Sequence, residues 1–371
     1  MKKLTIFHFN PLEWYPPLQN ILRVLESDTH FDTIRVITTR GRAELPVFLA
    51  HSKKIVIIRL GRSGAKLGLA TRWFTYFYFY SYGLFSLLKE RPGRVLYFET
   101  LSGWPAYIYK RFFYRSSKIY IHYHEYTTAA EYQKGMVLTR YFHALEHWLY
   151  PRAEWVSHTN PDRMSFFLRD VTPVKVAHPF ILPNYPPRNW LRPPHEVHEP
   201  LRIIYIGALG MDSMFTQEFA QWVTKWRQHV IWDIYTYNSD AKAIEFIKGL
   251  QSSNISLREG IHYEKLVDII PQYDVGVIFY KGIIMNHTYS VSNKFYEYLT
   301  CGLDVWFSTS LLSTLPYATI TSYPKILPLD FNSLEEVDPR KLCSRNGLTL
   351  RQDHYFCEVA LAPLIQKLTE E

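Results

Sequence analysis

Cysteine is scarce in this chain of 371 residues, which contains only Cys301, Cys343 and Cys357. An odd number of thiols without paired metal-ligand spacing excludes a disulfide framework or a cysteine-based metal site as the organising element. Free thiols fit a reducing compartment, so we expect a cytoplasmic protein.

Long hydrophobic runs are also lacking. The aromatic stretch at residues 73–88 contains serines and a glycine and is too short to span a bilayer comfortably. Two interpretations of it remain open: a helix buried against a sheet, or an aromatic face at a membrane interface beside basic residues. The short apolar run that ends at Pro11 has no cleavage site, so it predicts a first strand rather than a secretion signal.

Acidic residues are few in the first half. Residues 1–190 hold 26 lysines and arginines against 13 acids, a net charge of +13, whereas the remainder carries −5. Between residues 40 and 72 the only acid, Glu44, stands among Arg40, Arg42, Lys53, Lys54, Arg59, Arg62, Lys66 and Arg72. This half predicts an anionic partner: a phosphorylated lipid, a membrane surface, an acidic glycan or a nucleic acid. We expect no nucleic acid, because few basic residues interleave with the aromatic block.

Strand-length and helix-length segments alternate along nearly the whole chain, which predicts parallel βαβ units covered by helices. The proline-rich interval from Pro179 to Pro200 can continue neither a helix nor a central strand, so it predicts a linker between two α/β domains. Before it we expect strands at 4–9, 33–38, 54–60, 94–99, 118–123, 154–159 and 174–177. After it we expect strands at 201–206, 230–236, 255–257, 274–279, 303–307 and 325–327, and a last helix at about 352–367.

Residues 290–304 combine a polar loop, a short helix and a glycine stop. Ser292 or Asn293 can cap the helix and leave backbone N–H groups free at the positive end of its dipole, where an anion is favoured. Lys294 adds positive charge there, and Glu297 lies on the same face, where its carboxylate can accept hydrogen bonds from a ribose diol. The segment therefore predicts a nucleoside diphosphate site. An ordinary capped amphipathic helix is the alternative.

Four segments together resemble the GT-B glycosyltransferases, in particular the bacterial group called family-4-like. They are Tyr205-Ile-Gly-Ala-Leu209, Asn293-Lys-Phe-Tyr-Glu-Tyr-Leu-Thr-Cys-Gly302, His122-Tyr-His-Glu-Tyr126 and Leu182-Pro-Asn-Tyr-Pro186. The resemblance implies two doubly wound Rossmann-like domains that face a central cleft. Residues 1–190 would bind the acceptor and 198–350 the nucleotide-sugar donor, and a C-terminal helix in 351–371 could pack back on the first domain.

The resemblance also implies roles for residues in the donor half. Gly207 and Ala208 would bring backbone close to the donor diphosphate, Lys294 would neutralise it, and Glu297 would bind the ribose. The role of Gly207 also has support that does not depend on the resemblance, since a residue without a Cβ lets a phosphate approach the main chain. The whole implied donor site is Gly207, Ala208, Tyr237, Ile261, Ser292, Asn293, Lys294 and Glu297, with Tyr237 and Ile261 at the base. No essential metal is expected, because amides and Lys294 can stabilise the leaving diphosphate.

Two features depart from the family pattern. Tyr289 stands eight residues before Glu297, where relatives commonly have a second glutamate that grips the donor sugar. Residues 10–17 replace the usual glycine-rich loop after the first strand, and Glu13 and Trp14 are candidates for shaping the acceptor pocket there.

His124 is the candidate catalytic residue of the acceptor half. At the end of a strand it could polarise a hydroxyl or stabilise charge as the glycosidic bond breaks. If the anomeric configuration is inverted, a base is needed, and His124, Glu125 and Glu13 are the candidates in that order. If the configuration is retained, no such base is required. Alternatively, the side chains of His124 and Glu125 only form hydrogen bonds with backbone groups at the end of the strand.

Two metal interpretations are weaker. His122 and His124 share one strand face but lack a second cluster of ligands, so we expect no metal there. His143-Ala-Leu-Glu-His147 matches the pattern of inverted zinc peptidases, yet its aromatic neighbours indicate ordinary helix packing.

The sequence thus predicts a glycosyltransferase that moves a sugar from a nucleotide diphosphate sugar to a glycan or lipid-linked acceptor in bacterial surface polysaccharide or glycoconjugate synthesis. We expect it in the cytoplasm, with the basic half peripheral on the inner face of the plasma membrane. The alternative is a non-catalytic GT-B scaffold that binds an acidic glycan or a protein partner, for which the missing carboxylate at Tyr289 is the main support.

Overall fold

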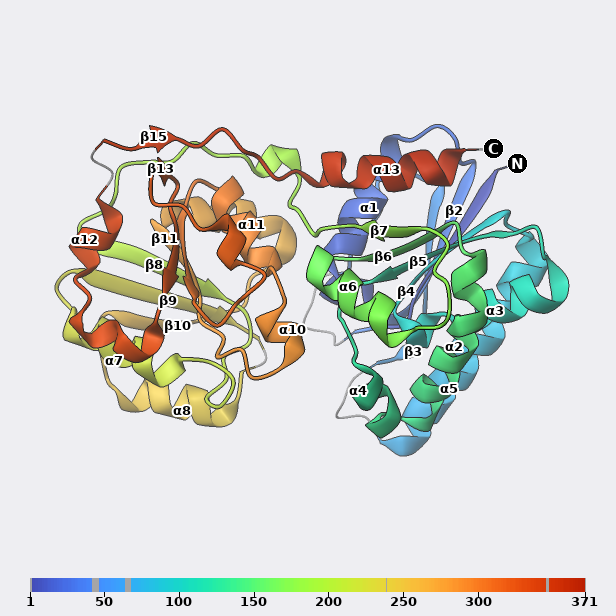
Figure 1. Cartoon of the computed structure of the whole chain (residues 1–371), viewed down its shortest axis with the longest axis horizontal. Helices are drawn as coiled ribbons and strands as arrows, with labels where there is room; N and C mark the ends of the chain where they lie inside the picture. The colour runs from blue at the N-terminus through green and yellow to red at the C-terminus, as the bar shows by residue number, and fades with distance from the viewer. Residues whose placement is uncertain (1, 42–46, 64–67, 238, 345–346, 371) are drawn as a thin grey trace. The chain divides into compact units, whose positions relative to one another are not determined.

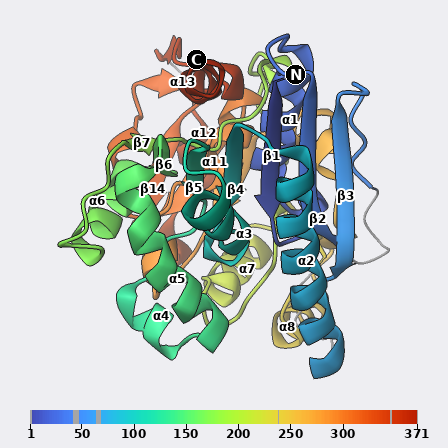
Figure 2. The same ribbon diagram turned by 90° about the vertical axis from the view of Figure 1, so that its right-hand side faces the viewer.

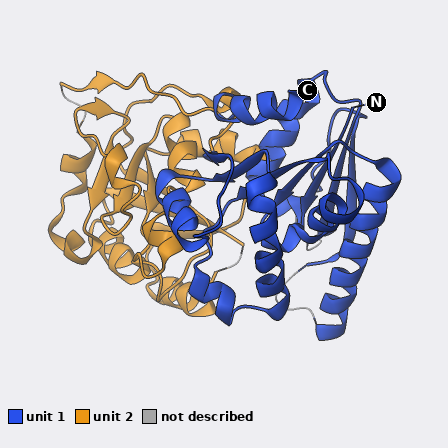
Figure 3. Ribbon diagram, turned by 45° about the vertical axis from the view of Figure 1, so that its right-hand side comes forward, with its two compact units in different colours: residues 1–184, 357–371 blue, residues 185–356 orange. Residues whose placement is uncertain are grey.

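The computed structural model describes residues 2–41, 47–63, 68–237, 239–344 and 347–370, which form two compact units (Figure 3). Unit 1 comprises Met1–Asn184 and Cys357–Glu371, and unit 2 comprises Tyr185–Phe356. Three members of the charged segment in the first half, Arg42, Glu44 and Lys66, lie outside the described residues.

Unit 1 is built on a parallel seven-stranded sheet in the order β3-β2-β1-β4-β5-β6-β7. The strands are β1 (Lys3–His8), β2 (Thr33–Arg40), β3 (Ile55–Arg62), β4 (Arg94–Phe98), β5 (Lys118–Tyr123), β6 (Trp155–His158) and β7 (Pro179–Ile181). The first six agree with the predicted strands to within two residues. The seventh prediction is wrong, because residues 174–177 form no strand and β7 pairs with β6 instead. Pro179 is tolerated in β7 because this strand is at the sheet edge, where a missing N–H costs no ladder bond.

Helices cover both faces of this sheet. They are α1 (Pro16–Ser27), α2 (Leu69–Glu90), α3 (Trp104–Ile108), α4 (Ala129–Lys134), α5 (Val137–Leu149), α6 (Pro161–Asp170) and α13 (Cys357–Thr369). The C-terminal helix α13 lies beside α1 (Figure 1), and the Tyr120 hydroxyl of β5 donates to the carbonyl of Lys367 at 2.8 Å. The expected return of the last helix to the first half of the chain is confirmed.

Helix α2 runs along β1, β2 and β3 (Figure 2). Its buried face includes Thr75, Phe79 and Gly83, and a Cβ on Gly83 would lie 2.9 Å from the Phe7 ring, so the helix approaches the sheet closely. The opposite face is apolar yet exposed, with Trp73, Phe74, Phe77, Tyr78 and Phe85 between 43% and 70% accessible. Packing against the sheet therefore explains the aromatic residues on one face of α2 and leaves those on the opposite face unexplained. The described residues contain no helix with the length and hydropathy needed to cross a membrane.

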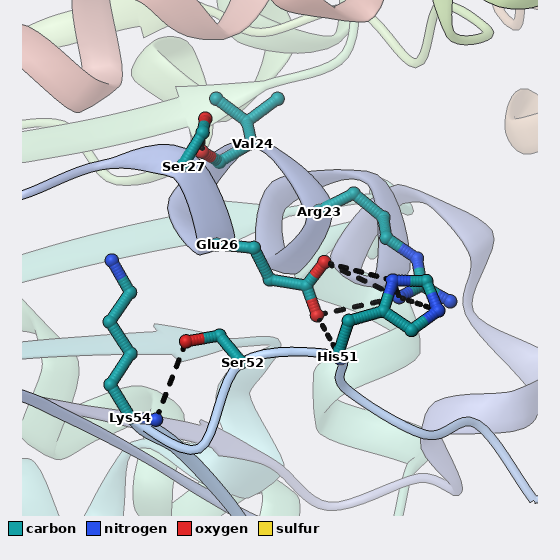
Figure 4. Close-up of polar contacts among 7 residues, drawn as sticks. All are labelled: Arg23, Val24, Glu26, Ser27, His51, Ser52 and Lys54. Carbon is teal, nitrogen blue, oxygen red and sulfur yellow. Dashed lines mark hydrogen bonds and ion pairs between the residues drawn. The ribbon is translucent and has the colours of Figure 1, made fainter.

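The segment before β3 is tied to α1 through polar contacts (Figure 4). The N–H of His51 donates to Glu26 at 2.5 Å, and Arg23 contacts both the Glu26 carboxylate at 3.4 Å and the His51 ring at 3.0 Å. These groups hold one another at the surface, and we assign them an anchoring role.

Unit 2 repeats the same winding in a parallel six-stranded sheet of order β10-β9-β8-β11-β12-β14. The strands are β8 (Leu201–Ile206), β9 (Val230–Thr236), β10 (Ile255–Glu259), β11 (Val275–Ile278), β12 (Asp304–Ser308) and β14 (Ile326–Leu329). The helices are α7 (Thr216–Lys225), α8 (Ala241–Gly249), α9 (Leu266–Ile269), α10 (Met285–Thr288), α11 (Asn293–Thr300) and α12 (Pro339–Cys343), and a short ladder joins β13 (Ser322–Tyr323) to β15 (Thr349–Leu350).

The core of unit 2 lies on both faces of its sheet. Neighbours along a strand point to opposite faces, so Trp306 packs with Trp222 on one side while Val305 packs with Phe295 of α11 on the other. Both sheets reverse strand order next to their first strand, at β1 and β4 in unit 1 and at β8 and β11 in unit 2. Ligands of open parallel sheets bind beyond the carboxyl ends of the strands at this point.

Candidate functional site

Helix α11 is fixed against the sheet of unit 2 by one tyrosine. The ring of Tyr298 lies so close to β11 that a Cβ on Gly276 would be 2.0 Å from it, and the Tyr298 hydroxyl accepts a hydrogen bond from the Ile206 N–H at 3.1 Å. Ile206 ends β8 and directly precedes Gly207. The predicted phosphate helix is therefore tied to the predicted glycine turn, through a contact that the sequence did not indicate.

The first turn of α11 has the predicted cap. Ser292 is the N-cap, and its hydroxyl accepts from the Lys294 N–H at 3.3 Å. Asn293 is the first helical residue and is half-buried. The remaining N–H groups at this end and the helix dipole favour an anion.

Lys294 of this turn forms an ion pair with Glu297 of the next turn, with Nζ 2.6 Å from Oε2. The Glu297 side chain is only 2% exposed, whereas that of Lys294 is 22% exposed. A buried carboxylate needs a partner or a neutralising ligand. Lys294 is thus held with its charge at the accessible side of the pair, where a second anion can meet it.

Gly207 and Ala208 form the turn after β8. The Gly207 N–H donates to Tyr235 at 3.0 Å, and the Tyr205 hydroxyl donates to the Ala208 carbonyl at 2.8 Å. Gly207 has φ +153°, and a Cβ there would lie 2.9 Å from the Tyr205 hydroxyl, so this position requires glycine. The turn follows the strand at which the sheet reverses.

Tyr237 and Ile261 follow the carboxyl ends of two adjacent strands. Tyr237 follows β9, Ile261 follows β10, and these strands pair in parallel. Between them, Gly260 lets the Tyr237 ring lie against the backbone, since a Cβ would be 2.3 Å from it. Tyr237 is 43% exposed, so its ring is accessible to a base that could stack on it, whereas Ile261 is half-buried and packs against the core cluster that contains Phe295.

In unit 1, His124 follows β5 at the carboxyl edge of the sheet. Its Nδ1 lies 2.6 Å from the Asn184 amide nitrogen, and its ring packs edge-to-face on Tyr15 at 4.9 Å. Desolvation, with Arg163 nearby, lowers the pKa of His124 to about 3, so the imidazole is neutral at physiological pH. An amide nitrogen donates, so Nδ1 accepts and the ring proton resides on Nε2. This tautomer makes His124 a hydrogen-bond donor rather than a base.

Glu99 is a residue that sequence reasoning missed. It follows β4, and its carboxylate accepts from the backbone N–H of His124 at 2.7 Å and of Glu125 at 3.2 Å. Burial and the Glu125 charge raise the pKa of Glu99 to about 8. The sequence offered one signal for Glu99: it follows a predicted strand, as His124 does. The carboxyl ends of neighbouring parallel strands lie at the same edge of a sheet, so residues that follow them lie close together.

The two other candidate bases have different surroundings. Glu125 is exposed, next to the turn that Glu99 holds. Glu13 is paired with Arg59 at 2.7 Å and also accepts from the Phe48 N–H at 3.2 Å. Among the described residues, no hydrogen bond or ion pair joins Glu13 to His124 or Glu125. Glu13 therefore holds β3 and the segment before it, and its catalytic role stays a prediction.

The histidine patterns of the first half serve packing. His122 points into the core, where its Nδ1 lies 2.8 Å from the Ser157 hydroxyl, so it does not share a partner with His124. His143 stacks flat on Tyr132 at 3.8 Å. Glu146, between His143 and His147, is buried and accepts from the Tyr97 hydroxyl at 2.9 Å. The peptidase-like pattern is therefore explained by helix packing.

One cluster in the described part of the chain has the donor atoms for a metal: His195, His198 and Asp274, whose atoms lie within 4.8 Å of one another. The buried Asp274 Oδ1 already lies 3.1 Å from His195 Nε2 and 2.8 Å from His198 Nδ1, and it accepts from the His198 N–H at 3.1 Å. These bonds tie the proline-rich segment to the start of β11. The cluster is accounted for without an ion.

No protein-family model and no curated protein sequence matches the chain. Solved structures do. Sucrose-phosphate synthase of Thermosynechococcus elongatus aligns with a TM-score of 0.64 at 15% identity, covering 100% of this chain and 95% of that one. HepE of Anabaena, in complex with UDP and glucose, aligns with 0.65 at 8% identity over 100% of both chains. The chain has the GT-B fold.

The GT-B fold also serves other chemistry. UDP-GlcNAc 2-epimerase of Neisseria meningitidis, bound to UDP-GlcNAc, aligns with a TM-score of 0.57 at 12% identity over 100% of both chains. Identities this low establish the fold and leave the reaction to be argued from side chains. The narrower likeness to the family-4-like group stays a prediction.

Proposed function

We propose that this chain is a glycosyltransferase that moves a sugar from a nucleoside diphosphate sugar to a glycan or lipid-linked acceptor. One observation carries the proposal: Lys294 in the first turn of α11 is paired with the buried Glu297 one turn on, and Tyr298 ties that helix to the Gly207 turn at the reversal point of the sheet. Together these groups offer a cation, free amides and a carboxylate, the set that a nucleoside diphosphate requires.

In this proposal the donor lies along the carboxyl edge of unit 2. The diphosphate meets Lys294, the amides after Ser292 and Asn293, and the backbone of Gly207 and Ala208. Glu297 accepts hydrogen bonds from the ribose hydroxyls as Lys294 turns toward phosphate. Tyr237 and Ile261 stack on the base.

Transfer breaks the bond between the anomeric carbon and a diphosphate oxygen, and the electron pair leaves on the diphosphate. The acceptor hydroxyl oxygen bonds to the same carbon, and its proton passes to the leaving diphosphate oxygen in a retaining reaction or to Glu125 in an inverting one. Lys294 and the α11 amides stabilise the developing negative charge in a site built for it. No step is assigned to a metal.

His124 acts in the acceptor half as a neutral donor. Its Nε2–H hydrogen-bonds a sugar or acceptor oxygen, while the Glu99 carboxyl group holds the turn that carries it. A donor at this position suits a retaining reaction, in which no protein base is required. An inverting reaction would instead require Glu125, the exposed carboxylate of the same turn.

The exposed aromatic face of α2 supports a peripheral position on an anionic membrane. Amphipathic aromatic side chains are favoured at the headgroup level, and the net charge of +13 in residues 1–190 attracts acidic lipids. In this part of the proposal, unit 1 receives a lipid-linked acceptor at the cytoplasmic surface.

A thermal-shift panel of uridine, guanosine, cytidine and thymidine diphosphates and their sugars tests the donor site. A ligand at 100 times its Kd adds about 2.7 kcal/mol to the free energy of unfolding. We expect one base to stabilise the protein and Lys294→Ala or Glu297→Gln to abolish that shift. Lys248→Ala and Glu245→Gln are the controls, because these residues have the same three-residue spacing, in the reverse order, on exposed positions of α8.

Product analysis with the stabilising donor then separates the reactions. Sugar transfer or slow hydrolysis that disappears in Lys294→Ala supports the proposal. An epimerised nucleotide sugar as product would indicate an isomerase rather than a transferase. Binding of the donor without turnover would favour the non-catalytic scaffold. If no nucleotide shifts the melting temperature, the donor site is refuted.

A further inference from the structure

A cavity of about 230 Å³ opens at the carboxyl edge of the sheet in unit 1. It is lined by residues that follow β1, by the end of β3 and by the first turns of α2, with Leu101 at its side. The lining residues are Phe9, Asn10, Trp14, Arg62, Ser63, Arg72, Thr75, Tyr76 and Leu101. Drug-sized ligands occupy roughly 300–1,000 Å³, so this cavity suits one sugar ring with its substituent.

Two arginines line this cavity, Arg62 at the end of β3 and Arg72 in the first turn of α2, and backbone contacts of Arg62 bring these two elements together. Arg62 exchanges hydrogen bonds with Thr75 of α2: its N–H donates to the Thr75 hydroxyl at 3.2 Å, and its carbonyl accepts from that hydroxyl at 3.0 Å. Gly61 allows this approach, since it has φ +62° and a Cβ would lie 2.7 Å from the Thr75 oxygen. Arg72 precedes Thr75 by three residues and so shares its helix face.

Neither guanidinium is neutralised by a described residue. Arg72 contacts only the Met136 sulfur, at 3.4 Å, and no ion pair involves Arg62 within the described ranges. Two other basic residues of this segment are used differently, since Arg59 is paired with Glu13 and Lys54 donates to the Asp28 carbonyl. Two like charges beside one small cavity repel each other unless an anion lies between them.

An aromatic wall completes the cavity. The half-buried Tyr76 ring stacks at 4.9 Å, with an interplanar angle of 15°, on Phe9, which is only 6% exposed, and Trp14 is 39% exposed. Such a surface packs against the apolar face of a ring, whereas guanidinium groups bind phosphate or carboxylate with paired hydrogen bonds.

Resting on the glycosyltransferase function proposed above, we propose that this cavity binds an acidic acceptor sugar, with its phosphate or carboxylate at Arg62 and Arg72 and its ring against the wall formed by Tyr76 and Trp14. The site selects a charged acceptor over a neutral one. Trp14 contributes to the wall, so the loop at residues 10–17 takes part in acceptor recognition.

Isothermal titration of the full-length protein with glucose 6-phosphate, glucuronate, inorganic phosphate and neutral glucose tests this site. We expect at least one acidic sugar to bind more than tenfold more tightly than glucose. Tighter binding of glucose 6-phosphate would indicate a phosphate site, and tighter binding of glucuronate a carboxylate site. Arg62→Ala and Arg72→Ala should each weaken that binding at least tenfold. Tyr76→Ala should weaken the acidic sugar while leaving inorganic phosphate within twofold.

Arg115→Ala is the matched control, because Arg115 is an exposed arginine of the same unit outside the cavity. It should change binding less than twofold. Equal affinity for glucose and the acidic sugars, no binding of either acidic sugar at millimolar concentration, or equal losses in Arg115→Ala and Arg62→Ala would overturn the inference. UDP titrated into the same variants separates the two proposals: normal UDP binding without acidic-sugar binding overturns only this one, whereas failure of every nucleoside diphosphate overturns the donor site.

Discussion

Glu99 has both a strained backbone conformation and a side-chain carboxyl group with a raised pKa. Its φ of +62° is costly for a residue with a Cβ, and its side chain is desolvated beside the Glu125 charge. The compensating contacts are the N–H groups of His124 and Glu125, which Glu99 holds in one turn. Strain and a perturbed carboxyl at a strand end are typical of functional sites.

The raised pKa of Glu99 predicts a pH dependence of stability. Below its ordinary pKa of 4.5 the carboxyl is neutral in both states, and between 4.5 and about 8 the unfolded chain releases a proton that the folded chain retains. Rising pH in this window therefore favours unfolding through this group, and the effect levels off above pH 8. Glu99→Gln removes the penalty and keeps an oxygen for the two N–H groups.

Melting curves of Glu99→Gln and of the parent protein measure this effect. The variant should gain melting temperature over the parent between pH 5 and pH 8, by about 2–4 °C for each kcal/mol. Glu154→Gln, a substitution at a half-buried position in the same unit, controls for the general loss of a negative charge. A difference that stays constant across the window would contradict the assignment.

At the scale of elements, the proposed donor site depends on how closely α11 approaches β11. Gly276 lies under the Tyr298 ring, and the Tyr298 hydroxyl bridges to the strand end before Gly207. A glycine inside a strand is usually unfavourable, and here it makes room for a side chain that positions a helix.

Gly276→Ala should therefore impair both stability and donor binding. The added Cβ would lie 2.0 Å from the Tyr298 ring, and overpacking of this kind costs about 1–3 kcal/mol. Displacement of Tyr298 also loosens α11 from the Gly207 turn, so the Kd for the nucleoside diphosphate should rise. Gly249→Ala is the control, because a Cβ there meets no atom within 4 Å. Similar melting temperatures for the two variants would argue against this packing role.

Helix α2 shows how far an element can be predicted from its sequence. The aromatic run predicts a helix, and the helix extends over Leu69–Glu90. Which aromatic rings are buried could not be predicted, since tyrosines and phenylalanines occur on every side of it. The position of the sheet determines which rings are buried: it covers the helix face that carries Phe79 and leaves the face with Phe77 exposed.

At the scale of the whole molecule, the charge difference between the two halves of the chain predicts a salt-dependent membrane affinity. Binding to vesicles that contain acidic lipids should fall as ionic strength rises, because basic residues contribute about 1 kcal/mol each near such a surface. The double variant Trp73→Ser/Phe77→Ser should weaken vesicle co-sedimentation at least tenfold at low salt by removing exposed aromatic area.

Val359→Ser serves as the control for this experiment, since Val359 is 60% exposed on α13 of the same unit. It should co-sediment like the parent protein. Equal binding of the parent protein and the double variant, or binding unaffected by lipid charge, would count against a membrane role for α2.

The sequence by itself determined the alternation of strands and helices, the two doubly wound sheets and the capped helix with Lys294 and Glu297, because these depend on local periodicity, capping and charge. Only the tertiary structure decided which distant groups meet. Tyr298 is joined to Ile206, Glu99 to the turn of His124, and Arg62 to the helix that carries Arg72. Parallel sheets bring strand ends from distant parts of the chain to one edge, and the side-chain contacts made there depend on packing that no local pattern records.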